Sequence, residues 1–437
     1  MLELNPEFRR NLWLELTRQR LIVVPVIVGL VVAVSWLAVS KARAGEIALA
    51  ALWGLLTVWG SRLAADALVE EVVGRTWENQ RMTALAPWSM TWGKLFGGTI
   101  VTWYGALWCI AAIALASDHA AGQIARAVLF GLLAQGVALL FAMLVLQLHD
   151  RTIRAHVSLA QFAALLVILG AYQIGSDGGA IVTWYGFDIA RDWFGYLSLV
   201  AAIAWVTLGI HRSMRTEMLA PGGPGLWFGF VLFAALYAGG FPRIVDSPVL
   251  ILIDTTQQQL VASILVLLGL TYGAAFLAPK RYARLRQLLA LLRHGDWRAA
   301  WPLLPPWSVS FLLAAVLACL FPLTALGTAR PLESTTTVAV FLAACLLFAL
   351  RDLGLVLMLT LDEQRGRSHV TALLYLVVLD GLLPLLFAPL GWSAALPVLV
   401  PWSAEGPALA LGPAALQAVL ALWLLRLRWL RLSRTAM

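Results

Sequence analysis

Residues 70–97, EEVVGRTWENQRMTALAPWSMTWGKLFG, carry six charged side chains between two long apolar segments. Charges at this density are too costly for the hydrocarbon of a bilayer, so the stretch must leave the membrane and fold at its surface. Thr76 is placed to cap a short helix over Trp77–Ala86, which Pro87 ends. Ser89 is placed to cap the next helix, which re-enters the membrane. We therefore expect a surface helix between two membrane spans.

The composition places the whole chain in a membrane. Hydrophobic residues make up 61% of the 437 residues and charged residues only 12%, whereas a soluble domain carries about 25% charged residues. A spanning helix needs about 20 apolar residues, so this length accommodates ten to twelve spans. The expected fold class is an all-α, multi-pass integral membrane protein.

Twelve apolar segments run from Leu21–Val39 to Leu409–Leu425 and form two halves of six. The seventh, Leu226–Gly240, is short, and the tenth, Thr337–Leu361, contains charges, so ten or eleven spans remain possible. With the N-terminus inside, most of the 31 Lys and Arg residues fall in cytoplasmic segments. The positive-inside rule then predicts that both termini are cytoplasmic.

The stretch at residues 70–97 resembles the cytoplasmic loop of ABC-2 type ABC-transporter permeases. Arg75 separates the adjacent Gly and Thr of the family pattern. The matching residues are Glu71, Gly74, Thr76, Glu78, Leu85, Pro87, Gly93 and Lys94. The resemblance implies that the short helix is a coupling helix on which a separate ATPase subunit docks, and it implies a location in the bacterial inner membrane.

The same resemblance implies roles for individual residues. Gly74, Thr76 and Pro87 would shape the loop. The charged docking contacts would be Arg75, Glu78 and Arg81, and the apolar ones Trp77, Met82 and Leu85.

No GxxxxGK[ST] motif occurs in the chain, so ATP and Mg²⁺ would be bound by the partner, expected in two copies. The exported substrate is not named by the resemblance, and nothing in the sequence indicates nucleic acid.

Four segments are expected along the chain. Residues 1–20 have a patchy apolar face among arginines and predict an amphipathic connecting helix on the membrane surface, with a plain polar tail as the alternative. Residues 21–215 form the first six-span half, residues 216–225 a linker, and residues 226–437 the second half. Whether one chain is complete or two associate stays open.

The second half is interpreted as a degenerate repeat of the first. Leu85–Ser89 (LAPWS) matches Leu304–Ser308 (LPPWS) at an offset of 219 residues, and Arg154–Val157 (RAHV) matches Arg367–Val370 (RSHV) at an offset of 213. The hexapeptide IVTWYG also occurs twice, at Ile100–Gly105 and Ile181–Gly186, but in non-equivalent places. We treat that recurrence as a coincidence.

A second basic loop, Pro279–Trp301, carries leucines at helical spacing among arginines. It is either a second coupling helix or a surface helix bound to anionic lipid, and the sequence favours neither. The residues of the second coupling candidate are Arg293, Asp296, Trp297 and Arg298.

Polar groups inside the predicted spans are few. Arg62 and Asp66 are four residues apart and are expected to pair on one helix face. We expect a structural bridge between Arg351 and Asp380, with Asp352 beside it, and a substrate or proton-coupling site as the alternative. Catalytic residues and metal ligands are not expected, because the cysteines and histidines lack ligand spacing.

Two rival functions remain open. A twelve-span secondary transporter would use the intramembrane charges for ion coupling. A membrane-embedded enzyme acting on lipid would need acidic, His or Cys residues clustered at one membrane face, and the sequence offers no such cluster.

Overall fold

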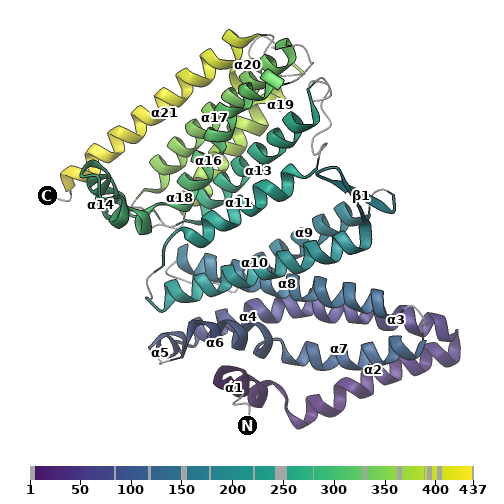
Figure 1. The fold of residues 1–437 in the computed structure, drawn as a ribbon. Coiled ribbons are helices and arrows are strands. Elements are labelled where there is room, and N and C mark those ends of the chain that lie inside the picture. The colour runs from purple at the N-terminus through teal and green to yellow at the C-terminus, as the bar shows by residue number, and fades with distance from the viewer. Residues whose placement is uncertain are drawn as a thin grey trace. The chain divides into compact units, whose positions relative to one another are not determined.

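A computed structural model describes most of the chain as helix (Figure 1). The described residues are 5–82, 85–116, 120–148, 155–176, 179–219, 222–241, 253–278, 280–327, 332–361, 367–387, 389–390, 396–400 and 406–435. They form two compact units, residues 1–182 with 188–222, and residues 183–187 with 223–437. The expected all-α membrane class agrees with this helical content.

The first unit holds the purple-to-teal helices of Figure 1. Its elements are α1 (Pro6–Glu15), α2 (Arg18–Ala38), α3 (Lys41–Trp53), η1 (Gly54–Trp59), α4 (Gly60–Val73), α5 (Trp77–Arg81), α6 (Pro87–Trp92), η2 (Gly93–Gly97), α7 (Ile100–Ala116), α8 (Ala120–Leu148), α9 (Ala155–Ser176) and α10 (Arg191–Glu217). Its largest core cluster joins α4, α8, α9 and α10.

The second unit holds most of the green-to-yellow helices. Its elements are α11 (Gly225–Gly239), α13 (Thr255–Leu277), α14 (Tyr282–Arg293), α15 (Trp297–Ala300), η3 (Trp301–Leu303), α16 (Pro306–Leu320), η4 (Phe321–Gly327), α17 (Leu332–Thr360), α18 (Arg367–Leu376), η5 (Val377–Leu382), α19 (Leu383–Phe387), α20 (Leu396–Leu399) and α21 (Pro407–Thr435). Its main core cluster joins α11, α13, α16 and α17.

Nine helices in the described part of the chain are long and apolar enough to cross a membrane. A tenth candidate is the pair Pro87–Gly97 and Ile100–Ala116, which bends by 53°. Val157–Gln173 and Gly225–Gly239 are apolar but shorter. These candidates together correspond to the twelve expected segments, so twelve stays the predicted number of spans.

Among the described residues three helical segments are π-helical, namely η1, η2 and η5. A π-helical turn leaves the regular hydrogen-bond ladder and often marks a functional site. In η1, side-chain amides of Gln135 and Gln161 donate to the carbonyl oxygens of Leu56 and Val58, at 3.0 and 2.9 Å. The other two segments each contain one charged residue, Lys94 in η2 and Asp380 in η5.

Both units contain the same local motif at the end of a helix. Two residues after the end of α4, Arg75 adopts the left-handed region (φ +56°), and Thr76 N donates to Glu71 O at 2.9 Å. Two residues after the end of α14, Gly295 adopts φ +74°, and Asp296 N donates to Leu291 O at 3.0 Å. These are Schellman caps.

The two caps strengthen the interpretation of a repeat. Each is followed at once by a short helix that begins with tryptophan, Trp77 or Trp297. Each short helix is followed by one that begins with Pro-Trp-Ser, α6 or α16. Both halves thus contain a cap, a short helix and a Pro-Trp-Ser start, but in the second half η3 lies between the short helix and α16.

The two IVTWYG copies adopt different structures. Ile100–Gly105 begins helix α7, whereas Ile181–Gly186 forms strand β1 (Ile181–Trp184) and the turn into β2 (Phe187–Ala190). The tip of this hairpin belongs to the second unit, where Tyr185 N donates to Gly240 O at 2.9 Å and Trp184 Nε1 donates to Tyr237 O at 3.1 Å. A β-carbon on Gly240 would lie 1.8 Å from the Trp184 ring, so that position requires glycine.

Candidate functional site

The N-terminal helix packs through polar rather than apolar side chains. The expected surface helix over residues 1–20 is shorter, because α1 ends at Glu15 and a new helix begins at Arg18. Its buried residues are Glu7 and Asn11, while Trp13 and Leu14 are exposed. The helix therefore packs on the protein through its polar side, while Trp13 and Leu14 stay exposed; its expected position on the membrane surface stays a prediction.

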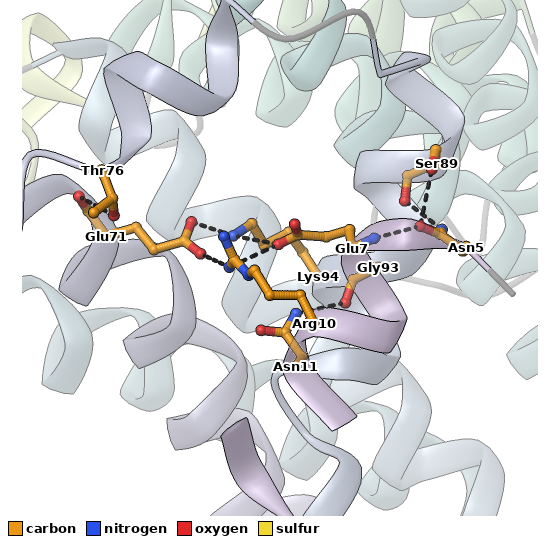
Figure 2. Close-up of polar contacts among 9 residues, drawn as sticks. All are labelled: Asn5, Glu7, Arg10, Asn11, Glu71, Thr76, Ser89, Gly93 and Lys94. Carbon is orange, nitrogen blue, oxygen red and sulfur yellow. Dashed lines mark hydrogen bonds and ion pairs between the residues drawn. The ribbon is translucent and has the colours of Figure 1, made fainter. Parts of the chain in front are cut away.

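Four charged side chains meet where α1, α4 and η2 come together (Figure 2). Lys94 Nζ lies 3.0 Å from Glu7 Oε1 and also pairs with Glu71. Arg10 Nη2 lies 3.0 Å from the same Glu7 oxygen and also pairs with Glu71. Two cations thus bridge the same two carboxylates, and we call this set the four-charge cluster.

The four-charge cluster is electrically balanced and partly buried, with Arg10 at its exposed edge (38% exposed). Lys94 is 1% exposed and Glu7 is 3% exposed. Balance matters, because removing one partner of a buried pair leaves an uncompensated charge and costs about 3–5 kcal/mol. The ring of Trp77 lies 5.8 Å from Lys94 Nζ and adds a cation–π contact.

Two glycines allow α1 to approach η2 closely. A β-carbon on Gly93 would lie 2.5 Å from Glu7 Cγ, and one on Gly97 would lie 2.6 Å from Asn11 Nδ2. Asn5 adds two hydrogen bonds to Ser89, donating to its carbonyl oxygen at 2.6 Å and accepting from its hydroxyl at 2.9 Å. Figure 2 shows these contacts flanking the four-charge cluster.

The short helix α5 spans Trp77–Arg81 and therefore ends earlier than the expected Trp77–Ala86. Residues 83–84 lie outside the described part, and Leu85 and Ala86 are not helical. The expected caps are also wrong. The Thr76 hydroxyl donates back to Glu71 O at 3.2 Å, and α5 has no side-chain cap. Ser89 lies inside α6, which Pro87 begins, and it bonds Asn5 instead.

The expected docking residues divide into exposed and buried ones. Arg75, Thr76, Glu78 and Met82 are exposed, Met82 by 79%. Trp77 is 3% exposed and belongs to the core, against which Leu85 also packs. Trp77 therefore anchors α5 to the protein core. It was expected among the exposed docking contacts, but the structure buries it.

Helix α10 also contacts the segment from α5 to α6. Arg81 Nε donates to Glu217 O at 2.8 Å, and its Nη1 lies 3.2 Å from Glu78. The rings of Trp88 and His211 stack with centroids 4.0 Å apart. The loop from α5 to α6 is thus fastened to α1, α4 and α10 together, so a displacement of α5 would be passed to several membrane helices.

A second polar cluster lies in the other unit and joins α13, α17, η5 and α21. Arg351 Nε donates to Asp352 Oδ1 at 2.7 Å, its Nη1 donates to Gln417 Oε1 at 2.8 Å, and its Nη2 donates to Asp380. The hydroxyl of Tyr272 donates to Asp352. The expected Arg351–Asp380 bridge is therefore present.

The remaining predicted polar residues are placed as follows. Arg62 and Asp66 form the expected pair, with Arg62 Nε 3.6 Å from Asp66 Oδ2. In the second loop Arg293 ends α14, and Asp296 Oδ1 accepts from Ala299 N at 3.1 Å as the cap of α15. Trp297 is 70% exposed and Arg298 is exposed.

Sequence reasoning missed the partners of several residues it had singled out. Glu7 and Arg10, which contact Lys94 and Glu71, were expected only as part of a surface helix. Tyr272 and Gln417, which bond Asp352 and Arg351, were not singled out. No signal set Glu7 apart, because residues 1–20 contain three glutamates among four arginines. Tyr272 and Gln417 gave no signal either, because a single polar residue in an apolar helix has many structural uses.

No group of His, Cys, Asp and Glu able to hold a metal ion occurs among the residues that the structure describes. Comparison with protein-family models, with curated proteins and with solved structures finds no match to this chain. A functional assignment therefore depends on the geometry of the two polar clusters and on the loop resemblance.

Proposed function

We propose that this chain is the transmembrane subunit of an ABC-2-like exporter, with α5 as the element that receives movement from a separate ATPase. The observation that carries the proposal is Lys94, buried between Glu7 of α1 and Glu71 of α4. Lys94 links η2, which follows the loop, to α4, which precedes the loop, and to the N-terminal helix α1.

Force transmission needs a stiff connection between the surface element and the spans. Buried, balanced and hydrogen-bonded charges provide fixed geometry, because each partner would be costly to expose or separate. The buried side chain of Trp77 anchors α5 in the core beside the four-charge cluster. A push on α5 would thus tilt α4 and the bent pair α6–α7 as one body.

The proposed docking surface consists of the exposed side chains around α5. These are Arg75, Thr76, Glu78 and Met82. Arg81 belongs to the supporting contacts, because its guanidinium is engaged by Glu217 and Glu78. The partner would bind ATP and Mg²⁺, and the chain would contribute the pathway for an exported substrate of a class still to be found.

The test is a double variant, Glu78→Lys with Met82→Asp, which changes the exposed surface, breaks the pair of Glu78 with Arg81 and leaves the four-charge cluster intact. We expect at least about tenfold weaker co-purification with a Walker-type ATPase that binds the unaltered chain, as for interface hot spots. Glu46→Lys, an exposed acid of α3, is the matched control. Unchanged binding and unchanged transport in the double variant would contradict the proposal.

A second candidate function is secondary transport, favoured by the Arg351–Asp352–Asp380 cluster. Ionisable groups inside membrane helices commonly mark ion or proton pathways. Two carboxylates share one guanidinium there, and Asp380 remains 39% exposed. Transport that survives ATP depletion but is lost in Asp380→Asn would favour this candidate over the ATP-driven one.

A further inference from the structure

The basic loop of the second unit presents an exposed, positively charged surface. Helices α14 and α15 carry exposed arginines without ion-pair partners among the described residues. These are Arg281, Arg284, Arg286, Arg293 and Arg298. Asp296 is the single acidic residue in residues 280–327, and its carboxylate is engaged as a helix cap. The surface is therefore strongly positive and not self-neutralised.

The end of helix α21 brings more positive charge to the same place. The rings of Tyr282 and Trp429 pack with centroids 4.6 Å apart, which fixes α14 against the last turns of α21, as Figure 1 shows. That helix carries Arg426, Arg428, Arg431 and Arg434 and has no acidic residue. Two basic segments far apart in the sequence are thus joined into one patch.

Apolar side chains accompany the arginines. Helix α14 buries Tyr282 and Leu288 against the protein, yet Leu289 is 43% exposed. Trp297 and Trp301, just beyond α14, are 70% and 45% exposed. Exposed tryptophan and leucine beside arginine are typical of a helix that lies in the headgroup layer of a bilayer. An acidic protein surface would match the positive charge of the arginines, but it would not explain why Leu289, Trp297 and Trp301 are exposed.

A buried ammonium lies at the start of this segment. Lys280 is 8% exposed and donates to Ala278 O at 3.3 Å, with no carboxylate of the described residues in ion-pair range. Burial lowers the pKa of Lys280 to about 8. A buried, uncompensated cation is unfavourable, and a nearby anion relieves it.

From these observations we infer that the patch formed by Lys280, α14, α15 and the end of α21 binds the phosphate headgroup of an anionic phospholipid. The headgroup would neutralise the arginines while its acyl chains cover Leu289, Trp297 and Trp301. The segment proposed above as a second coupling candidate would then be a lipid-binding element. This inference does not depend on the ATPase, so it stands or falls separately from the exporter proposal.

The experiment uses the full chain purified in a neutral detergent and supplied with phosphatidylglycerol or phosphatidylcholine. Native mass spectrometry measures how many lipids of each class are retained. We expect preferential retention of phosphatidylglycerol, and a thermal stability increase specific to that lipid. Each arginine near an anionic surface contributes about fivefold in affinity, so Arg284→Gln, Arg286→Gln and Arg293→Gln combined would remove most of the preference.

Matched controls are Arg43→Gln and Arg126→Gln, because both arginines are exposed but paired with acidic residues. They should keep the preference. Equal retention of the two lipids by the unaltered chain, or an unchanged preference in the triple variant, would overturn the inference. A stability increase given equally by inorganic phosphate without lipid would also overturn it, because the site would then recognise free phosphate.

Discussion

The ammonium of Lys94 pairs with the carboxylate of Glu71, 23 positions earlier in the sequence, within the first unit. Because Glu7 and Arg10 of the N-terminal helix complete the same cluster, three segments far apart in the sequence depend on one another. The loop between two membrane helices is therefore anchored at its base while the surface of α5 stays free.

Replacing Lys94 with methionine should strongly destabilise the first unit. Glu7 and Glu71 would then face each other with Arg10 alone, and breaking a buried pair costs about 3–5 kcal/mol. The thermal unfolding temperature of the purified chain measures the effect. Arg43→Gln, which breaks an exposed pair with Glu46, should cost less than about 1 kcal/mol. Equal effects of the two substitutions would mean that the cluster is not structural.

Substituting Gly93 with alanine should detach α1 without removing any charge. The new β-carbon would meet Glu7 Cβ at 2.6 Å, close to the α1 backbone, so the helix itself must move. Faster hydrogen exchange or proteolysis within residues 6–17 reports that movement. Gly29→Ala is the control, because no atom lies within 4 Å of a β-carbon there.

Replacing Arg75 with glycine should stabilise the chain. Arg75 adopts φ +56°, a left-handed conformation that costs a non-glycine residue about 1 kcal/mol or more, whereas the equivalent cap of α14 already has Gly295. The gain is reduced by the greater freedom of glycine in the unfolded chain. The converse change, Gly295→Ala, should lower stability. A loss of stability in Arg75→Gly would show that the arginine side chain makes a compensating contact.

Lys280 should make stability depend on pH in the alkaline range. Its pKa falls from 10.5 in the unfolded chain to about 8 in the folded one, so the unfolded state holds more protons between these values. Stability should therefore rise as the pH increases from about 8 to about 10.5, by about 3 kcal/mol, and the penalty is fully present below pH 8. Comparing unfolding across that range in Lys280→Met, with exposed Lys41→Met as control, isolates this contribution. A bound anionic lipid should weaken the rise.

Replacing Arg351 with glutamine should destabilise the second unit more than replacing Asp380 with asparagine. Arg351 is 4% exposed and bonds Asp352, Asp380 and Gln417 at once, whereas Asp380 is 39% exposed. A double-mutant cycle between the two positions measures their coupling. A coupling free energy near zero would show that the bridge does not contribute to stability.

Much of the fold followed from apolar patterning. Each expected segment coincides with a helix, because a run of about 20 apolar residues in a bilayer can satisfy its backbone only as a helix. Exact ends could not be predicted, and α4 and α10 extend beyond the apolar core. The two polar clusters were predicted only in part. Arg351 and Asp380 attract notice as charges in apolar surroundings, and Glu71 and Lys94 were singled out by the loop resemblance, but the contacts with Glu7, Arg10, Tyr272 and Gln417 were not predicted.

The amino-acid sequence by itself determined the membrane class, the succession of apolar helices and the charged loop between them, because these depend on composition and local pattern. The tertiary structure alone decided which charges meet. It also decided the conformation of IVTWYG, which is helical at Ile100–Gly105 and forms a hairpin at Ile181–Gly186. Six residues have no fixed preference of their own, so the hydrogen bonds available from neighbouring segments select one structure at each place.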